Sequence, residues 1–255
     1  MPDKIAAVLH ELERQEGFKI LFAAESGSRA WGFASPDSDY DIRVIYVEPE
    51  SWYWSLDTRR PDTFDAMMPG ELDISAWELR KTLRLFAGCN LSLNEWLGSP
   101  IVYYADPKFT EGLRSLIPVY FNSFRTAHHY LALSDKALED RQPDGSIAVK
   151  KLFYALRGLL AAMWTVKMQA MPPTPFAELL DPEYLPAEIL NEIAMLQEIK
   201  VRSNEKSRIP FPEMLSDFFT TEREYILQNI SGFSVGKTSW QPLDKLFYET
   251  VKSFG

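Results

Sequence analysis

Residues 25–48 read ESGSRAWGFASPDSDYDIRVIYVE and contain the pattern that decides the fold. The segment starts where one apolar run, FKILFAA, ends, and it finishes inside a second run, IRVIYV. Asp37, Asp39 and Asp41 occupy alternate positions at the start of the second run. Residues two apart on a strand point to the same face, so Asp39 and Asp41 place like charges side by side. Such a pair suits a site for hard divalent cations better than it suits a structural role.

The composition is that of a globular protein with a sizeable core, because 46% of its 255 residues are hydrophobic and 25% are charged. Its net charge of −9 argues against a broad nucleic-acid-binding surface but is compatible with a local basic groove. No apolar run approaches the ~20 residues that cross a bilayer, so we expect no membrane partner. The N-terminus lacks the apolar stretch of a signal peptide, and the single cysteine, Cys89, excludes an internal disulfide. We therefore expect a cytoplasmic protein.

Strand patterns cluster early in the chain and helical patterns cluster late. We expect a helix over 3–16, strands near 18–24 and 40–47, and a weaker strand near 62–68. The segment ELDISAWELRKTLRLFAG starts extended and becomes helical, whereas helical periodicity dominates after about residue 110. This order predicts an α/β or α+β unit over 1–110, followed by a mostly helical domain over 111–255.

A third carboxylate and a glycine turn complete the candidate site. Asp73 lies in the apolar segment LDISAW, where a carboxylate without a partner would be costly. Three carboxylates can hold two metals roughly 3.5–4 Å apart that bridge a triphosphate and an attacking hydroxyl. Gly27 and Ser28 follow the first strand, where a glycine lets the backbone approach a phosphate closely. Arg29 is a candidate for added charge or a surface residue.

The Gly27-Ser28 pair and the later D-x-D motif resemble the polymerase-β superfamily of nucleotidyltransferases. The blocks GSRAWGFASPDSDYDIRVIYV, LDISAWELRKTLRLFAGCNLSLNEWL and KKLFYALRGLLAAMW resemble the RlaP-like family, which is assigned by prediction to RNA repair pathways. The resemblance covers about residues 18–180 and implies an α+β fold. In this fold a nucleotidyltransferase-like catalytic domain over 1–110, with a mixed sheet and helices, precedes a substrate-binding helical domain over 111–255. Leu91 departs from the proline that we expect in relatives, which affects a turn and leaves the chemistry untouched.

The resemblance also implies roles for individual residues. Gly27 and Ser28 would grip the triphosphate, Asp39 and Asp41 would hold two Mg²⁺ or Mn²⁺ ions, and Asp73 would activate the acceptor hydroxyl. Further candidates for nucleotide binding are Arg29, Ser38, Lys151 and Tyr154, although Ser38 is also suited to cap a turn and the last two to surface and core roles. The implied reaction transfers a nucleoside monophosphate from an NTP, which we expect to be ATP, to the hydroxyl of an RNA end, a small molecule or a protein. The oligomeric state is not readable from the sequence.

Other interpretations fit some of the same residues. Asp37, Asp39, Asp41 and Glu48 match positions of a calcium-binding EF-hand loop, but Ile42 stands where that loop needs glycine. Asp37 is also a good turn residue after a proline. At the level of function, the alternative to an enzyme is a catalytically quiet nucleotide-binding regulatory module. A further alternative is an AMP transferase that acts on a partner protein.

Overall fold

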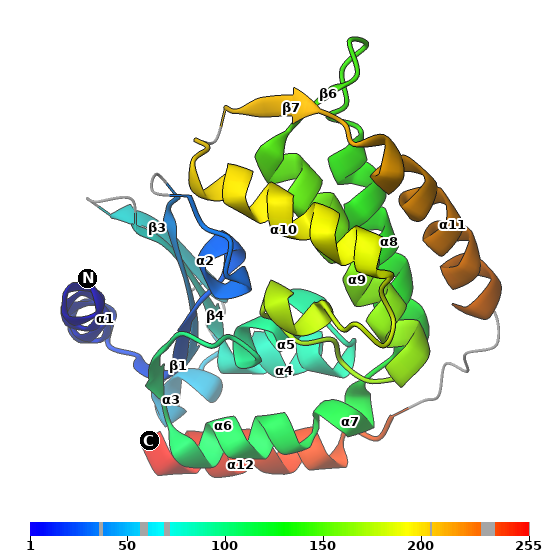
Figure 1. Cartoon of the computed structure of the whole chain (residues 1–255). Helices are drawn as coiled ribbons and strands as arrows, with labels where there is room; N and C mark the ends of the chain where they lie inside the picture. The colour runs from blue at the N-terminus through cyan, green and yellow to red at the C-terminus, as the bar shows by residue number, and fades with distance from the viewer. Residues whose placement is uncertain (36–37, 57–60, 69–71, 205, 231–237, 255) are drawn as a thin grey trace. The chain divides into compact units, whose positions relative to one another are not determined.

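The computed structural model describes residues 1–35, 38–56, 61–68, 72–204, 206–230 and 238–254, so the expected turn residue Asp37 lies outside the described residues (Figure 1). The chain divides into two compact units, each described here by itself. The sheet unit comprises Met1–Ala30, Asp39–Tyr120 and Lys237–Gly255, and the helical unit comprises Trp31–Ser38 and Phe121–Gly236.

A mixed five-stranded sheet forms the centre of the sheet unit, as the α+β prediction required. Its strands are β1 (Lys19–Glu25), β2 (Tyr40–Val47), β3 (Thr63–Met68), β4 (Leu72–Glu78) and β5 (Val102–Ala105). They lie in the order β3-β4-β2-β1-β5. β2 and β4 are parallel, and the other neighbouring pairs are antiparallel. The two parallel strands therefore begin at the same end of the sheet.

The two faces of the sheet are covered differently (Figure 1). Helix α1 (Pro2–Glu16) buries Ile5, Leu9 and Leu12 against Ile42 and Val44 of β2 on one face. Opposite it, Ile45 and Val47 share a second core with a group of helices. These helices are α4 (Leu79–Ala87), α5 (Leu91–Leu97), α6 (Pro107–Ser115), α7 (Ile117–Tyr120) and α12 (Gln241–Phe254). Because side chains alternate along a strand, Asp41 and Arg43 point to this second face.

The C-terminal helix α12 belongs to the sheet unit, whereas the sequence placed the boundary near residue 110. Leu243, Leu246 and Val251 of α12 pack into the same core as Phe109 and Leu113 of α6. Helical periodicity shows that a helix has an apolar face but not which core that face joins. The order of elements along the chain therefore did not reveal that the last helix returns to the sheet.

The helical unit contains α8 (Ser123–Leu138), α9 (Val149–Met168), α10 (Ala187–Val201) and α11 (Glu213–Ile230), with the short strands β6 (Ser146–Ala148) and β7 (Arg208–Pro210). α9 is its most buried helix, with Leu152, Phe153 and Leu156 fully enclosed. Helices α8 and α11 pack against α9 (Figure 1). No helix in the described ranges combines the length and the apolar character that a membrane span requires.

Candidate active site

Two of the predicted carboxylates are direct neighbours in the sheet. Asp41 of β2 pairs with Asp73 of β4 in the parallel ladder. Adjacent strands lie about 4.8 Å apart. The two side chains therefore lie side by side, on the face of the sheet opposite α1. Asp39 precedes β2 by one residue and is exposed. The sheet thus gathers Asp41 and Asp73 at the beginning of the parallel strands, with Asp39 next to them along the chain.

Gly27 lies directly against one member of this pair, Asp41. It begins the short helix α2 (Gly27–Trp31) with a positive φ of 61°, a backbone conformation that favours glycine. A Cβ placed on Gly27 would overlap a carboxylate oxygen of Asp41. The neighbouring Ser26 N–H donates to the main-chain oxygen of Asp41 at 2.8 Å. The glycine turn after β1 is therefore closed onto the start of β2.

Arg43 bridges the two neighbouring carboxylates. Its Nη2 lies 2.8 Å from Asp41 Oδ1 and 2.8 Å from Asp73 Oδ2. Its Nη1 donates to the main-chain oxygen of Asp73 at 3.1 Å. The side chain of Arg43 is only 17% exposed, against 30% for Asp41 and 35% for Asp73. A single guanidinium therefore joins β2 to β4 and balances part of their negative charge.

The ionisation of Asp41 reflects this crowding. Burial raises the pKa of Asp41, the positive charge of Arg43 opposes that rise, and the negative charges of Asp73 and Asp39 add to it. The net direction of the shift is upward because burial, together with the two neighbouring carboxylates, outweighs the positive charge of Arg43. A site with excess negative charge on a partly buried surface attracts cations.

A fourth carboxylate, that of Glu25, was not predicted from the sequence and holds the backbone of the site. Glu25 at the end of β1 is fully buried, and its Oε1 accepts the main-chain N–H of Asp41 at 2.8 Å. Tyr103 of β5 donates its hydroxyl to the other oxygen of Glu25. Burial raises the pKa of Glu25, while the hydrogen bond from Tyr103 opposes the rise. Glu25 therefore fixes the backbone that carries Asp41.

Arg29 also contacts the start of β2. Its Nε donates to the main-chain oxygen of Asp39 at 3.0 Å, and its guanidinium carbon lies 3.8 Å from the ring centroid of Tyr40. The adjacent Ser28 is 7% exposed. In the described part of the chain the Ser28 hydroxyl makes no hydrogen bond. Arg29 thus orders the segment that carries Asp39, and its nucleotide-binding role stays a prediction, as does that of Ser28.

The remaining predicted residues belong to the helical unit. The Ser38 hydroxyl accepts the N–H of Ser35 at 3.0 Å and contacts the Ser35 hydroxyl at 3.1 Å, which is the turn-capping arrangement. On α9, Lys151 is exposed and the ring of Tyr154 lies 5.1 Å from that of Trp31. Nucleotide binding by Ser38, Lys151 and Tyr154 stays a prediction.

A comparison with known protein families shows the family to which the chain belongs. Residues 1–249 match the family described as RlaP, the RNA repair pathway DNA polymerase beta family. The chain belongs to the RlaP family. It is 38% identical over 253 residues to the uncharacterized protein YcgL of Bacillus subtilis (strain 168), which covers 99% of this chain and 97% of that protein.

A solved structure resembles this RlaP-family chain only at low identity. It is the crystal structure of a nucleotidyltransferase-like protein from Exiguobacterium sibiricum 255-15. The two share 13% identity, with a TM-score of 0.31 over 98% of this chain and 80% of that chain. The family match, which confirms the resemblance expected from the sequence, therefore carries the assignment to the polymerase-β-type nucleotidyltransferases.

The RlaP-family site has the donors for a divalent metal but not a completed ligand set. Across the described ranges, no group of three or more His, Cys, Asp or Glu side chains is arranged to hold a metal ion. Arg43 donates hydrogen bonds to one carboxylate oxygen of Asp41 and to one of Asp73. The donor chemistry nevertheless suits Mg²⁺ or Mn²⁺, which prefer carboxylate oxygens. The EF-hand interpretation is wrong, because Tyr40–Val47 is a strand in a sheet.

Proposed function

We propose that this chain is a nucleotidyltransferase that moves a nucleoside monophosphate from an NTP to an acceptor hydroxyl. The observation that supports the proposal best is the pairing of Asp41 with Asp73 beside Gly27. A purely structural sheet gains nothing from two adjacent like charges, which repel each other. A triphosphate, by contrast, needs the glycine turn for close backbone approach and the carboxylates for its accompanying cations.

In the proposed reaction the acceptor oxygen forms a bond to the α-phosphorus of the NTP. The bond between that phosphorus and the oxygen that bridges to the β-phosphate breaks, and pyrophosphate leaves. By analogy with the family, Asp73 would receive the proton of the acceptor hydroxyl. Asp39, Asp41 and Asp73 would hold Mg²⁺ or Mn²⁺, which supplies neutralisation of phosphate charge when bound.

The chain's own residues contribute positioning. Glu25 and Arg29 hold the backbone of Asp41 and Asp39 respectively. Arg43 holds the Asp41 and Asp73 carboxylates at one separation. A pre-organised group of charges lowers the barrier because little reorganisation is needed during the reaction. Arg43 contacts one oxygen of each carboxylate. We assign it the role of a positioning residue whose guanidinium would give way to a cation bound between the two carboxylates.

Pyrophosphate release from each NTP, with Mg²⁺ or Mn²⁺ present, tests the proposal. Wild type and Asp3→Asn, which changes an exposed carboxylate at the start of α1, are expected to turn over equally. Asp39→Asn and Asp41→Asn are expected to lose at least about a hundredfold of the rate, as when charge-stabilising groups are removed. Equal release from all four proteins would rule out catalysis by these carboxylates.

The acceptor is tested with labelled NTP and a mixture of RNA and protein fractions. Label retained on RNA supports transfer to an RNA terminus, as the family description suggests, and label on protein supports AMP transfer to a partner. The chain's acidic balance makes a short terminus a better acceptor than a long duplex.

A second candidate function is a nucleotide-binding module without turnover. Arg43 favours it, because its guanidinium already occupies both neighbouring carboxylates. Calorimetry separates the two functions. Binding of Mg·ATP without pyrophosphate or labelled product supports the module, and any metal-dependent product supports the enzyme.

A further inference from the structure

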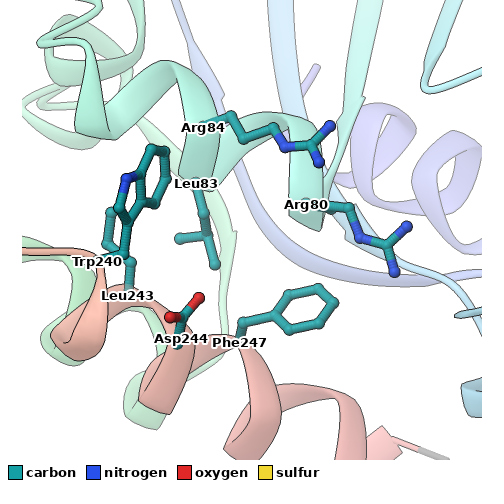
Figure 2. A pocket seen from close by; sticks show the side chains of 7 residues that line it. All are labelled: Arg80, Leu83, Arg84, Trp240, Leu243, Asp244 and Phe247. Carbon is teal, nitrogen blue, oxygen red and sulfur yellow. The ribbon is translucent and has the colours of Figure 1, made fainter.

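A cavity of about 520 Å³ lies between α4 and α12, within the sheet unit (Figure 2). Binding pockets for small molecules have about this volume. Figure 2 shows side chains from α4 on one side and from α12 and the residue before it on the other. The lining residues are Arg80, Leu83, Arg84, Trp240, Leu243, Asp244 and Phe247. The cavity thus combines two cations, one anion and two aromatic rings.

The two arginines outnumber the one acidic side chain, Asp244, that lines the same cavity. Among the described residues, neither Arg80 nor Arg84 lies within ion-pair distance of a carboxylate. Their neighbour Lys81 differs, because its ammonium lies 3.0 Å from Asp62. Two guanidinium groups that form no ion pair in the described ranges, together with one carboxylate, leave the lining of this cavity with excess positive charge, in a chain of net charge −9. They indicate an anionic ligand, since guanidinium groups match phosphate oxygens well.

Arg80 is held in place by aromatic rings. Its guanidinium carbon lies 5.1 Å from the ring centroid of Tyr53, 5.5 Å from that of Phe247 and 5.9 Å from that of Trp52. Tyr53 and Trp52 belong to the short helix α3 (Glu50–Tyr53). Cation–π contacts use the faces of the rings and leave the N–H donors of the guanidinium available. Arg80 is therefore pre-organised as a donor of hydrogen bonds.

Trp240 supplies a different kind of contact. Its side chain is 53% exposed although tryptophan is usually much more buried. It lies at the rim of the same cavity, directly before α12. An exposed indole next to arginines is the arrangement on which a nucleobase stacks while its phosphate is bound. Asp244, whose carboxylate points from α12 towards α4, can accept a hydrogen bond from a ribose hydroxyl or a base amine (Figure 2).

The cavity is distinct from the carboxylate site. Asp73 is the second residue of β4, whereas Arg80 lies in the first turn of the helix that follows that strand. The strand between them is about 17 Å long at the usual rise per residue. The carboxylates and the arginines therefore lie at opposite ends of β4. Binding in the cavity is tested separately from the proposed catalysis.

From these contacts we infer that the α4–α12 cavity binds a phosphorylated nucleotide, with the base on Trp240 and the phosphate on Arg80 and Arg84. A nucleotide combines the three features that the cavity requires: a flat ring, an anion and hydrogen-bond donors for Asp244. The source is either a free mononucleotide or a nucleotide within a single strand. Both present the same chemistry to the cavity, and the two arms of the test distinguish them.

The test measures binding in EDTA, so that no cation links a phosphate to the carboxylate site. One arm uses AMP in calorimetry, and the other uses a fluorescent, 5′-phosphorylated oligoribonucleotide in an anisotropy titration. Arg84→Gln and Trp240→Leu change the cavity at exposed side chains, which protects the fold. Lys245→Gln is the matched control, because it removes one positive charge from α12, the other helix of the cavity, at a side chain that is 77% exposed and does not line the cavity. Asp41→Asn reports on the other site, and thermal melts verify folding.

Arg84→Gln and Trp240→Leu are each expected to weaken binding by about tenfold, the usual loss for a charged hydrogen bond or a stacked base. Lys245→Gln and Asp41→Asn are expected to bind as wild type does. Binding of AMP identifies a free nucleotide as sufficient, and binding of the oligonucleotide alone identifies a strand. The inference is overturned if wild type binds neither probe, if Trp240→Leu binds normally, or if Lys245→Gln loses as much affinity as Arg84→Gln.

Discussion

Asp41 and Asp73 stand opposite each other in the parallel ladder of β2 and β4, and one nitrogen of Arg43 lies 2.8 Å from an oxygen of each. The arrangement brings together two like charges that a fold without a function at this place has no reason to retain. Its consequences for stability, metal binding and turnover can be measured separately.

Asp41 is expected to lower the stability of the metal-free protein. Burial raises the pKa of Asp41, Arg43 opposes the rise, and Asp73 and Asp39 add to it. A carboxylate with a raised pKa binds its proton more tightly in the folded state, so its ionised form destabilises the fold. This loss is complete above the folded pKa and disappears as the pH falls below the unfolded value of about 3.9.

In EDTA at neutral pH, Asp41→Asn is therefore expected to melt a few degrees above wild type. The difference should shrink towards zero near about pH 3.5, where both states of the wild-type side chain are protonated. Thermal melts across this range measure the effect, with Asp3→Asn, which changes an exposed carboxylate on α1, as the control. A variant that melts below wild type at neutral pH would contradict the sign of the Asp41 shift.

Gly27→Ala is expected to damage both stability and turnover. The substitution forces a side chain into a positive φ, which costs about 1–2 kcal/mol, and also pushes the new methyl group into the Asp41 carboxylate. Gly17→Ala is the matched control, because its φ is also positive, at 76°, but nothing lies within 4 Å of the added atom. Urea unfolding should show a larger loss for Gly27→Ala, and only that variant should lose activity.

The sequence predicted the parts of the site that depend on local pattern. The alternation in YDIRVIYV predicted a strand near 40–47, and the structure confirms it as Tyr40–Val47. The positions of Gly27, Asp41 and Asp73 relative to the predicted strands singled them out, and the family resemblance then suggested their roles. Arg43 was not singled out, although it shares the alternation of Asp41, because an arginine two positions along a strand also fits a solvated edge. Its bridge depends on the register between β2 and β4, which only the folded sheet fixes.

Glu25 and β5 were missed for a related reason. Glu25 ends an apolar run, where a glutamate usually marks the point at which a strand meets solvent. It is buried because Tyr103 of β5 covers it, and β5 is too short, at four residues, to give a clear pattern. Contacts between distant segments thus determined both the burial of the carboxylate and the strand that supports it.

Tyr103→Phe tests the support that Glu25 receives. Removing the hydroxyl leaves one oxygen of a buried carboxylate without its donor, which costs about 1–3 kcal/mol. Tyr104→Phe is the neighbouring control, since in the described part of the chain the Tyr104 hydroxyl makes no hydrogen bond. Urea unfolding is expected to show the loss for Tyr103→Phe, with Tyr104→Phe within about 0.5 kcal/mol of wild type. Equal losses in the free energy of unfolding for the two variants would mean that the hydrogen bond from Tyr103 to Glu25 does not contribute to stability.

Arg43→Met is expected to convert a balanced pair of carboxylates into a stronger cation site. Without metal, the loss of the bridge should lower the free energy of unfolding by about 1–3 kcal/mol, because Asp41 and Asp73 then repel each other unopposed. Added Mn²⁺ should recover that stability, since a cation then takes the place of the guanidinium. The rise in melting temperature on adding Mn²⁺ should therefore be larger for Arg43→Met than for wild type.

Turnover should nevertheless fall in Arg43→Met, because the carboxylates lose the contact that fixes their separation. Arg14→Met on α1 is the control, since that arginine also pairs with a carboxylate, Glu11, but on an exposed surface. Calorimetry with Mn²⁺ measures the affinity directly. An equal response to Mn²⁺ in wild type and Arg43→Met would show that the guanidinium does not exchange with metal, and no response in either protein would remove the metal from the proposed site altogether.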